Sequence, residues 1–471
     1  MTRPLILDPD RLFPADPRTR DIARALYAPV RDLPIVSPHG HTDPAWFATN
    51  APFADPAQLL IVPDHYVFRM LYSQGIALDA LGIPTDDGSP TESDPRKIWR
   101  LFAENYRLFR GTPSRLWLDW VFAEAFGLDV RLEAETADLY YETIDAALKT
   151  DAFRPRALFE RFGIELIATT ESPLDPLDHH RAIRESGWAG RVVTAYRPDP
   201  VMDPEHPGFA GNLVRFGEMA GEDVSTFEGY LRAHENRRAF FRDAGATSTD
   251  HGHPSAFTAD LPRAQAEQLY AAVRAGPCKP EEAELFRGQM LTEMARMSLD
   301  DGMVMQIHPG AFRSHNAPVL ARFGRDKGAD IPVQTEYVRA LKPLLDRFGN
   351  EAGLTIILFT LDEDVYSREL APLAGHYPAL RLGPPWWFHD SPEGMRRFRE
   401  AATESAGFYN TVGFNDDTRA FLSIPARHDV ARRMDCAFLA RLVAEHRLEE
   451  DEAHEVARAL AYDLVKAAYK L

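Results

Sequence analysis

Near the start of the chain lies the stretch Leu33-Pro34-Ile35-Val36-Ser37-Pro38-His39-Gly40-His41-Thr42-Asp43. Its apolar run, residues 33–36, has the length and composition of a buried strand. Because alternate residues at the end of a strand point to the same side, the imidazoles of His39 and His41 can reach one metal ion. The stretch therefore indicates a divalent metal site, although a His-x-His pair also occurs by chance on protein surfaces.

Short apolar runs of this kind recur along the chain, each followed by polar residues and separated from the next by a helix-like segment. Buried parallel strands have this composition because helices cover both faces of their sheet. Repeated strand–helix units predict an α/β protein with a closed (β/α)8 TIM-type barrel. Apolar residues at helical spacing predict outer helices over residues 262–274, 280–297, 429–445 and 452–466. The eight predicted strands are residues 33–36, 164–168, 192–195, 246–249, 303–307, 355–359, 379–382 and 411–414.

The segment after the first predicted strand is too long for the single helix that joins two barrel strands. We expect a helical insertion at about residues 43–162, with its own core, that forms a lid over the barrel. The whole chain, residues 1–471, is then one barrel domain that carries this insertion. Packing explains its aromatic side chains better than a cofactor role does. These side chains include Trp99, Phe102, Tyr106, Trp117 and Trp120.

The composition is that of an ordinary globular protein. Of the 471 residues, 45% are hydrophobic and 26% are charged, and no apolar run approaches the roughly 18 residues that a membrane span needs. An acidic residue and proline interrupt the N-terminal segment before it contains an apolar region long enough for a secretory signal, so we expect a cytoplasmic protein. The two cysteines, Cys278 and Cys436, lack CxxC spacing and indicate neither a disulfide framework nor a cysteine metal site.

The overall charge limits the choice of partners. A formal net charge of -18 argues against a nucleic-acid partner. An anionic substrate then needs local arginines that capture it against the overall field. Because barrels with exposed helices often associate, we expect a homo-oligomer.

Ionisable side chains gather directly after the predicted strands. In barrels the loops at the carboxyl ends of the strands form the active site, so this convergence indicates a function, although any single histidine can simply satisfy a backbone group. Two histidines and a carboxylate from the last strand, Asp417 or Asp416, suit a zinc ion that keeps open positions for substrate. We expect one metal ion, because no lysine lies at the fourth strand to bridge two. The ionisable segments are residues 39–41, 196–199, 250–253, 308–313, 384–390 and 415–419.

Two arginines at this rim, Arg197 and Arg419, are the natural anion clamps. A guanidinium group matches a carboxylate in a bidentate fashion, so these side chains predict an acidic substrate. The alternative is that both arginines only neutralise the neighbouring aspartates.

Seven spaced segments together resemble the uronate isomerase (glucuronate isomerase) family of the amidohydrolase superfamily, and the resemblance runs nearly end to end. A lone His-x-His pair would indicate only the superfamily, whereas the full set is specific to the isomerase. One departure is an extra residue within 423–428, which leaves the path of that loop open. The segments are His39-Gly40-His41, Asp64-His65-Tyr66, Tyr196-Arg197-Pro198-Asp199, Asp250-His251-Gly252, Gln306-Ile307-His308, Gly383-Pro384-Pro385-Trp386-Trp387-Phe388 and Asp417-Thr418-Arg419 with Phe421-Leu422-Ser423.

The resemblance implies reversible conversion of D-glucuronate to D-fructuronate, and of D-galacturonate to D-tagaturonate, by proton transfer between C2 and C1 through an enediol. One divalent metal ion, expected to be zinc, would bind His39, His41 and Asp417. Asp417 would also relay the hydroxyl proton during ring opening, while Tyr66 with His65 moves the carbon proton. The alternative for Tyr66 is a hydrogen bond to substrate without proton transfer. Substrate contacts are expected from Arg197, Arg419, His308, Asp250, Trp386 and Trp387.

Two other functions fit some of these features. A metal-dependent hydrolase or lactonase on the same barrel would use the same His-x-His pair and last-strand aspartate. A sugar-acid binding protein would use the barrel only as a scaffold, since a fold does not assign a function. A pure binder, however, has little need for both a metal and the pair His65 and Tyr66.

Overall fold

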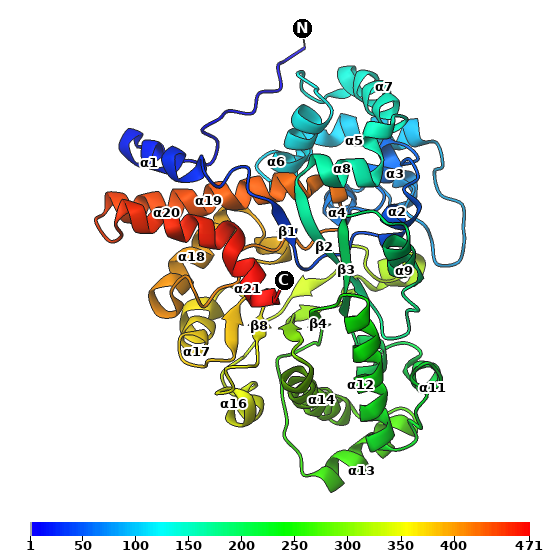
Figure 1. Ribbon diagram of the computed structural model, residues 1–471. Coiled ribbons are helices and arrows are strands. Elements are labelled where there is room, and N and C mark those ends of the chain that lie inside the picture. The colour runs from blue at the N-terminus through cyan, green and yellow to red at the C-terminus, as the bar shows by residue number, and fades with distance from the viewer. Residues whose placement is uncertain (1) are drawn as a thin grey trace.

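The computed structural model describes residues 2–471, and a curved parallel sheet runs through its centre (Figure 1). Seven strands pair in the order β1-β2-β3-β4-β5-β8-β9, and every neighbouring pair is parallel. The strands are mostly buried, because helices cover the outside of the sheet. Their bounds are β1 Ile35–Ser37, β2 Ile164–Glu171, β3 Arg191–Tyr196, β4 Ser248–His251, β5 Val304–Ile307, β8 Ile356–Leu358 and β9 Leu380–Leu382.

Seven of the eight predicted strands are confirmed, but residues 411–414 do not form a strand. In the described part of the chain this segment makes a single isolated bridge, between Thr411 and Leu382. Gly413 has φ +75, a left-handed conformation in which an extended strand cannot continue. Its backbone also packs closely on the C-terminal helices, since an added Cβ would lie 2.5 Å from the Leu460 carbonyl oxygen. The hydrogen-bonded sheet is therefore a seven-stranded half-barrel rather than the closed eight-stranded barrel that the sequence predicted.

A second, two-stranded sheet was not predicted from the sequence. Its antiparallel strands are β6 Ala311–Phe312 and β7 Ile331–Pro332, which lie in the long connection that follows β5. They hold the ends of residues 313–330 together near the carboxyl end of the main sheet. This connection supplies part of the cavity described below.

Helices connect the strands and cover the sheet, and the four predicted outer helices are present. Residues 262–274 correspond to α13, and residues 280–297 to α14, which extends four residues further. Residues 429–445 lie within α19, and residues 452–466 span α20 and α21 with a short π-helical turn between them. The helices after β2 are α9 Asp178–Glu185, α10 Asp199–Met202, α11 Phe209–Ala220, α12 Phe227–Asp243, α13 Arg263–Arg274, α14 Pro280–Asp301, α15 Ala317–Phe323, α16 Lys342–Phe348, α17 Ala371–Ala374, α18 Pro392–Ala406, α19 Ile424–Ala444, α20 Glu450–Arg458 and α21 Leu464–Tyr469.

Seven helices fill the interval between β1 and β2 and lie together at the top of Figure 1. Several begin with an aspartate followed by proline: the carboxylates of Asp43, Asp55 and Asp94 accept N–H groups of the first turn, and the proline fixes φ at the first helical position. Most of the predicted aromatic side chains pack in one buried cluster that also includes Ile164 and Ile167 of β2, whereas Trp117 packs in the cluster that contains Tyr66. The helices are α2 Pro44–Thr49, α3 Pro56–Leu60, α4 His65–Tyr72, α5 Pro95–Asn105, α6 Pro113–Trp120, α7 Ala137–Leu148 and α8 Pro155–Arg161.

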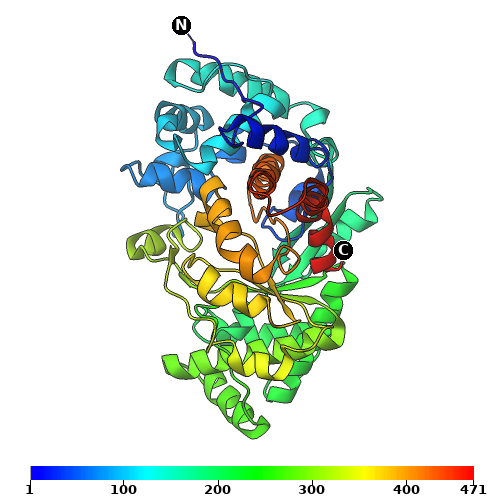
Figure 2. The same ribbon diagram turned by 90° about the vertical axis from the view of Figure 1, so that its left-hand side faces the viewer.

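The two ends of the described chain pack together. Helix α1 (Pro17–Tyr27) lies against the C-terminal helices in Figure 2, and Leu26 shares a buried cluster there with Leu439 and Leu460. Within residues 2–471, none of the helices is both long and apolar enough to cross a membrane.

Candidate active site

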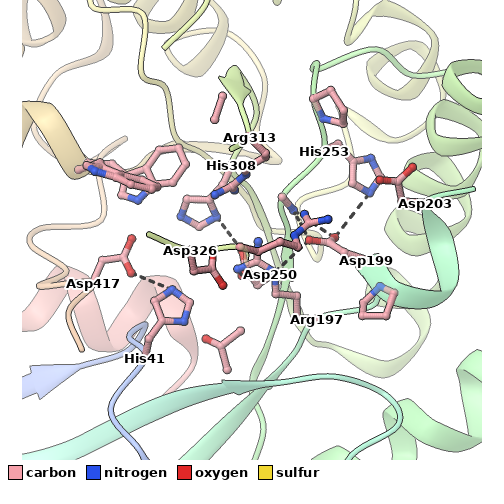
Figure 3. Close-up of a pocket in the computed structure, with 18 of the residues that line it drawn as sticks. His41, Arg197, Asp199, Asp203, Asp250, His253, His308, Arg313, Asp326 and Asp417 are labelled. Carbon is pink, nitrogen blue, oxygen red and sulfur yellow. Dashed lines mark hydrogen bonds and ion pairs between the residues drawn. The ribbon is translucent and has the colours of Figure 1, made fainter. Parts of the chain in front are cut away.

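A cavity of about 770 Å³ opens at the carboxyl ends of the strands (Figure 3). All the predicted site residues line it, although they come from segments that lie far apart in the sequence. Most follow strands of the sheet, and two come from the start of α4 in the insertion. These residues are His39, His41, His65, Tyr66, Arg197, Asp250, His308, Trp386, Trp387, Asp417 and Arg419.

Within residues 2–471, the predicted metal ligands form one of two clusters that could hold an ion. Nε2 of His39 lies 3.5 Å from Oδ1 of Asp417, and Nε2 of His41 lies 3.2 Å from the same oxygen. The N–H of His41 donates to the carbonyl of Thr418 at 3.1 Å, which ties the loop after β1 to the loop that carries Asp417. Asp417 itself has φ +39, a strained backbone for a residue other than glycine. The other candidate aspartate, Asp416, is paired with His428 at 3.1 Å instead.

A second cluster shares His39 with the first. His39, Asp250 and His308 each offer a ligand atom, and these atoms lie within 4.8 Å of one another. Nδ1 of His308 is 2.7 Å from Oδ1 of Asp250, and its ring stacks on that of Phe359 with 3.9 Å between centroids. All three cluster members are buried. The cavity therefore contains the nitrogen and oxygen ligands that a divalent metal ion needs.

Burial and neighbouring charges set the ionisation of these ligands in the direction that metal binding requires. Burial lowers the pKa of His41, which favours the neutral imidazole. Burial alone would raise the pKa of Asp417, but His39 and His41 outweigh it and hold this pKa well below its usual value. In the same way, Arg197 and His308 outweigh burial and hold the pKa of Asp250 well below its usual value. Neutral imidazoles and ionised carboxylates are the forms that coordinate metals, so the residues fit such an ion.

The two predicted anion clamps differ in how they are held. Nε of Arg197 donates to Asp199 at 2.9 Å, and its Nη1 lies 3.0 Å from Asp250. Burial alone would lower the pKa of Arg197, but the carboxylates of Asp250 and Asp199 raise this pKa above its usual value, so the guanidinium stays charged. Arg419 is paired more loosely, at 3.5 Å from Asp326. Arg197 is thus largely neutralised by aspartates, as the alternative interpretation held, whereas Arg419 keeps most of its donors available.

The insertion brings His65 and Tyr66 to the cavity because α4 begins with these two residues. Asp64 caps the helix by accepting the N–H of Tyr66 at 2.8 Å. Burial and, to a smaller extent, the positive charge of Arg419 lower the pKa of His65 to about 3, so its imidazole is neutral near pH 7. Burial raises the pKa of Tyr66 despite the nearby guanidinium of Arg427, so the phenol keeps its proton.

Two tryptophans form an apolar wall. Trp387 stacks on His65 with 5.1 Å between ring centroids, and Trp386 meets the edge of His308 at 4.8 Å. Both indoles are buried, and Trp387 has φ +51, a second strained backbone at this site.

Several charged residues at or beneath the cavity were not singled out from the sequence as site residues. Arg313, the last residue of the predicted segment 308–313, and Asp326 line the cavity, and both lie in the long connection between β5 and α16. Arg427 is fully buried beneath it, 2.5 Å from Asp390, with its guanidinium carbon 5.0 Å from the centre of the Tyr66 ring. The sequence signal for Asp326 is its position between Gly324 and Gly328, a pattern typical of an exposed loop.

Comparison with known proteins gives a consistent result. The family model described as glucuronate isomerase matches residues 18–469. A uronate isomerase from Phenylobacterium zucineum (strain HLK1) is 70% identical over 471 residues, which cover 100% of this chain and 98% of that protein.

Solved structures agree with the sequence relatives. The crystal structure of glucuronate isomerase from Caulobacter crescentus superposes with a TM-score of 0.98 at 65% identity, covering 99% of this chain and 98% of that one. The uronate isomerase from Thermotoga maritima superposes with a TM-score of 0.91 at 26% identity, covering 98% of this chain and 99% of that one.

These matches cover nearly the whole chain and agree in name. They favour the aldose–ketose isomerase that the sequence predicted over the hydrolase alternative. The chain belongs to the uronate isomerase family.

Proposed function

We propose that the cavity interconverts D-glucuronate with D-fructuronate, and D-galacturonate with D-tagaturonate, using one zinc ion held by His39, His41 and Asp417. The observation that carries this proposal is the convergence of metal ligands, an available arginine and a neutral histidine–tyrosine pair on one cavity. A sugar acid offers a partner for each of these groups: hydroxyl and carbonyl oxygens, a carboxylate, and an acidic proton at C2.

The metal site is proposed as zinc because two imidazoles and one carboxylate leave open positions in its preferred coordination. A divalent ion bound there supplies a Lewis acid that polarises a substrate oxygen. His39 belongs to both clusters, so with His39 among the metal ligands, Asp250 and His308 would be left to contact substrate hydroxyl groups.

Proton transfer at carbon is assigned to His65 and Tyr66. The neutral imidazole of His65 accepts the C2 proton while the phenol of Tyr66 donates its proton to O1, which gives the enediol. The imidazolium then gives a proton to C1 and the phenolate takes one back from O2, so both side chains return to their starting states. Asp417 remains ionised and accepts the hydroxyl proton during ring opening. The apolar wall of Trp386 and Trp387 packs against the rings of His65 and His308 and holds them in place.

The substrate carboxylate is assigned chiefly to Arg419. A bidentate guanidinium–carboxylate pair fixes the acid end of the sugar and, with it, the position of C1 and C2. Arg197, already held by Asp199 and Asp250, adds positive potential that stabilises the enediolate as its charge develops.

We also infer that residues 411–414 close the barrel, in the position of an eighth strand but with irregular backbone. The Thr411–Leu382 bridge on one side and the hydrogen bond from His41 to Thr418 on the other support this.

The chain is accordingly proposed as one domain with a lid insertion at about residues 43–162. A homo-oligomeric state and a cytoplasmic location stay predictions.

The test is turnover of D-glucuronate and D-galacturonate in D₂O with metal-loaded and chelator-treated protein, followed by NMR. The expected result is ketose formation that depends on zinc, with deuterium at C1. Ketose without deuterium would point to a hydride shift or a shielded proton. Absence of ketose in both preparations would contradict the proposal.

The proton assignment has its own test. Tyr66→Phe removes the phenolic proton but keeps the ring, and we expect kcat to fall about 100-fold, the lower range for a general acid or base. Measured zinc content and thermal stability should stay at wild-type values. An unchanged kcat would leave Tyr66 only a binding role.

A further inference from the structure

A five-residue loop, Gly324-Arg325-Asp326-Lys327-Gly328, connects α15 to β7 beside the cavity. Gly324, Asp326 and Gly328 have left-handed backbone angles, with φ of +77, +60 and +70. Within residues 2–471, the backbone of residues 325–328 makes no hydrogen bond. A segment without such bonds costs little free energy to move.

The two glycines anchor this loop to the helical insertion. A Cβ added to Gly324 would lie 2.7 Å from the Asp86 carboxylate, and one added to Gly328 would lie 3.0 Å from Cβ of Arg69 and 3.2 Å from the carbonyl oxygen of His65. Only glycine allows this approach. The ends of the loop are therefore fixed while its centre, Asp326, is free to change position.

Asp326 points into the cavity, as Figure 3 shows, and its side chain is 55% exposed there. Among the described residues, it is the only carboxylate paired with Arg419. Two of the other cavity arginines have fixed partners: Arg197 is held by two aspartates, and Arg313 donates to Asp330 at 2.8 Å. Arg419 is thus the cation whose single counter-ion sits on a movable segment.

We propose that Asp326 is a displaceable internal carboxylate: it holds Arg419 in the ligand-free enzyme, and the carboxylate of the uronate replaces it as the centre of loop 324–328 swings away. This inference rests on the role proposed above for Arg419. It makes Asp326 a residue that sets substrate affinity without touching the reacting atoms.

Charge explains why the two carboxylates exclude each other. Partial burial would raise the pKa of Asp326, but Arg419, Arg197 and Arg313 outweigh it and lower the pKa to about 2. Asp326 is therefore ionised near pH 7, as a uronate is. Two anions at one guanidinium repel each other, so the substrate carboxylate binds Arg419 more tightly once the covalently tethered carboxylate has moved away.

The first experiment compares Asp326→Asn with Asp364→Asn, an identical change at an exposed loop position outside the cavity. Removing the competitor should lower KM for D-glucuronate about three- to tenfold, because more of the enzyme is then ready to bind. The kcat of the variant should stay within about twofold of the wild-type value, and Asp364→Asn should change neither constant. An unchanged or higher KM in Asp326→Asn would overturn the inference, since a residue that binds substrate hydroxyls gives that result.

The second experiment needs no variant. Arg325 and Lys327 are trypsin sites within the loop itself, so cleavage there reports its position. D-gluconate, a six-carbon sugar acid without the reactive aldehyde, should speed cleavage at these two bonds several-fold, as measured by mass spectrometry. Protection or an unchanged rate would mean that the loop closes on the ligand or does not move, and either result contradicts displacement.

Calorimetric titration with D-gluconate separates the displacement of Asp326 from the role proposed for Arg419 in binding the substrate carboxylate. If Arg419→Gln leaves the affinity unchanged, the proposed role of Arg419 is wrong. If Arg419→Gln weakens binding but Asp326→Asn does not tighten it, only the displacement is wrong.

Discussion

Two His-x-His segments in this chain share their spacing but not their surroundings. His39-Gly40-His41 follows the end of β1, and both imidazoles meet Asp417. His251-Gly252-His253 begins on the last residue of β4, and Nε2 of His251 lies 3.0 Å from the hydroxyl of Thr249 instead. Neither His251 nor His253 belongs to a cluster of possible metal ligands within residues 2–471.

The strand register explains the difference. Successive side chains on a strand point to opposite faces, so when Asp250 faces the cavity, His251 faces the other way and is fully buried. His39 and His41 lie beyond the paired part of β1, where the chain turns towards the loop that carries Asp417. The motif therefore predicts a metal site only when another segment brings a carboxylate to it.

The largest expected effect tests that conclusion directly. His41→Asn should lose most of the bound metal and more than about 100-fold in kcat/KM, since even outer partners of metal ligands are worth that much. The matched change His253→Asn should keep the metal, as measured by mass spectrometry of the purified protein. Loss of metal from the His253 variant would break the comparison.

A middle-sized effect is expected at the central glycines. A Cβ at Gly40 would meet the Thr418 carbonyl at an ordinary 3.5 Å, whereas one at Gly252 would lie 2.3 Å from Nη2 of Arg197. Gly252→Ala should therefore displace Arg197 and lower kcat for D-glucuronate about tenfold, or about 1.4 kcal/mol in the barrier. Gly40→Ala should change kcat less than twofold; equal effects in steady-state assays would show that the two glycines are equivalent.

The last effect concerns stability rather than activity, and it depends on pH. Burial lowers the pKa of His251 to about 3, against an ordinary value of 6.5, so the unfolded chain binds this proton more readily than the folded one. The contribution of the neutral, buried imidazole to the free energy of unfolding is present above pH 6.5 and is lost as pH falls towards 3. Between pH 7 and pH 5 the loss is about 2 kcal/mol.

His251→Gln removes this titration, so its melting temperature should fall less than that of the wild-type protein between these two pH values. Scanning calorimetry at both pH values gives the difference. An equal fall in both proteins would place the acid sensitivity elsewhere.

Much of the molecule was predictable because its signals are local. Most of the seven confirmed strands are runs of apolar residues, with the polar β4 as an exception, and the residues that follow them reach the cavity. Residues 411–414 have the same composition, but Gly413 adopts a conformation that depends on packing against Leu460, which a linear pattern does not contain.

The remaining features depend on contacts between distant segments. Strands β6 and β7 have two residues each, too few for a periodic signal. Asp326 reaches Arg419 only because its loop packs against the insertion, and Arg427 contacts the Tyr66 ring only because the first turns of α19 and α4 meet. Such placements follow from the assembled fold rather than from residue spacing.

The left-handed backbone at Asp417 has a consequence for engineering. Strain at such a residue costs about 1 kcal/mol or more, which glycine would relieve. A screen that selects variants only for heat resistance would therefore favour Asp417→Gly and discard the carboxylate that both histidines face. Thermostable versions of this enzyme are better sought in its outer helices, with residue 417 held fixed and activity scored alongside melting temperature.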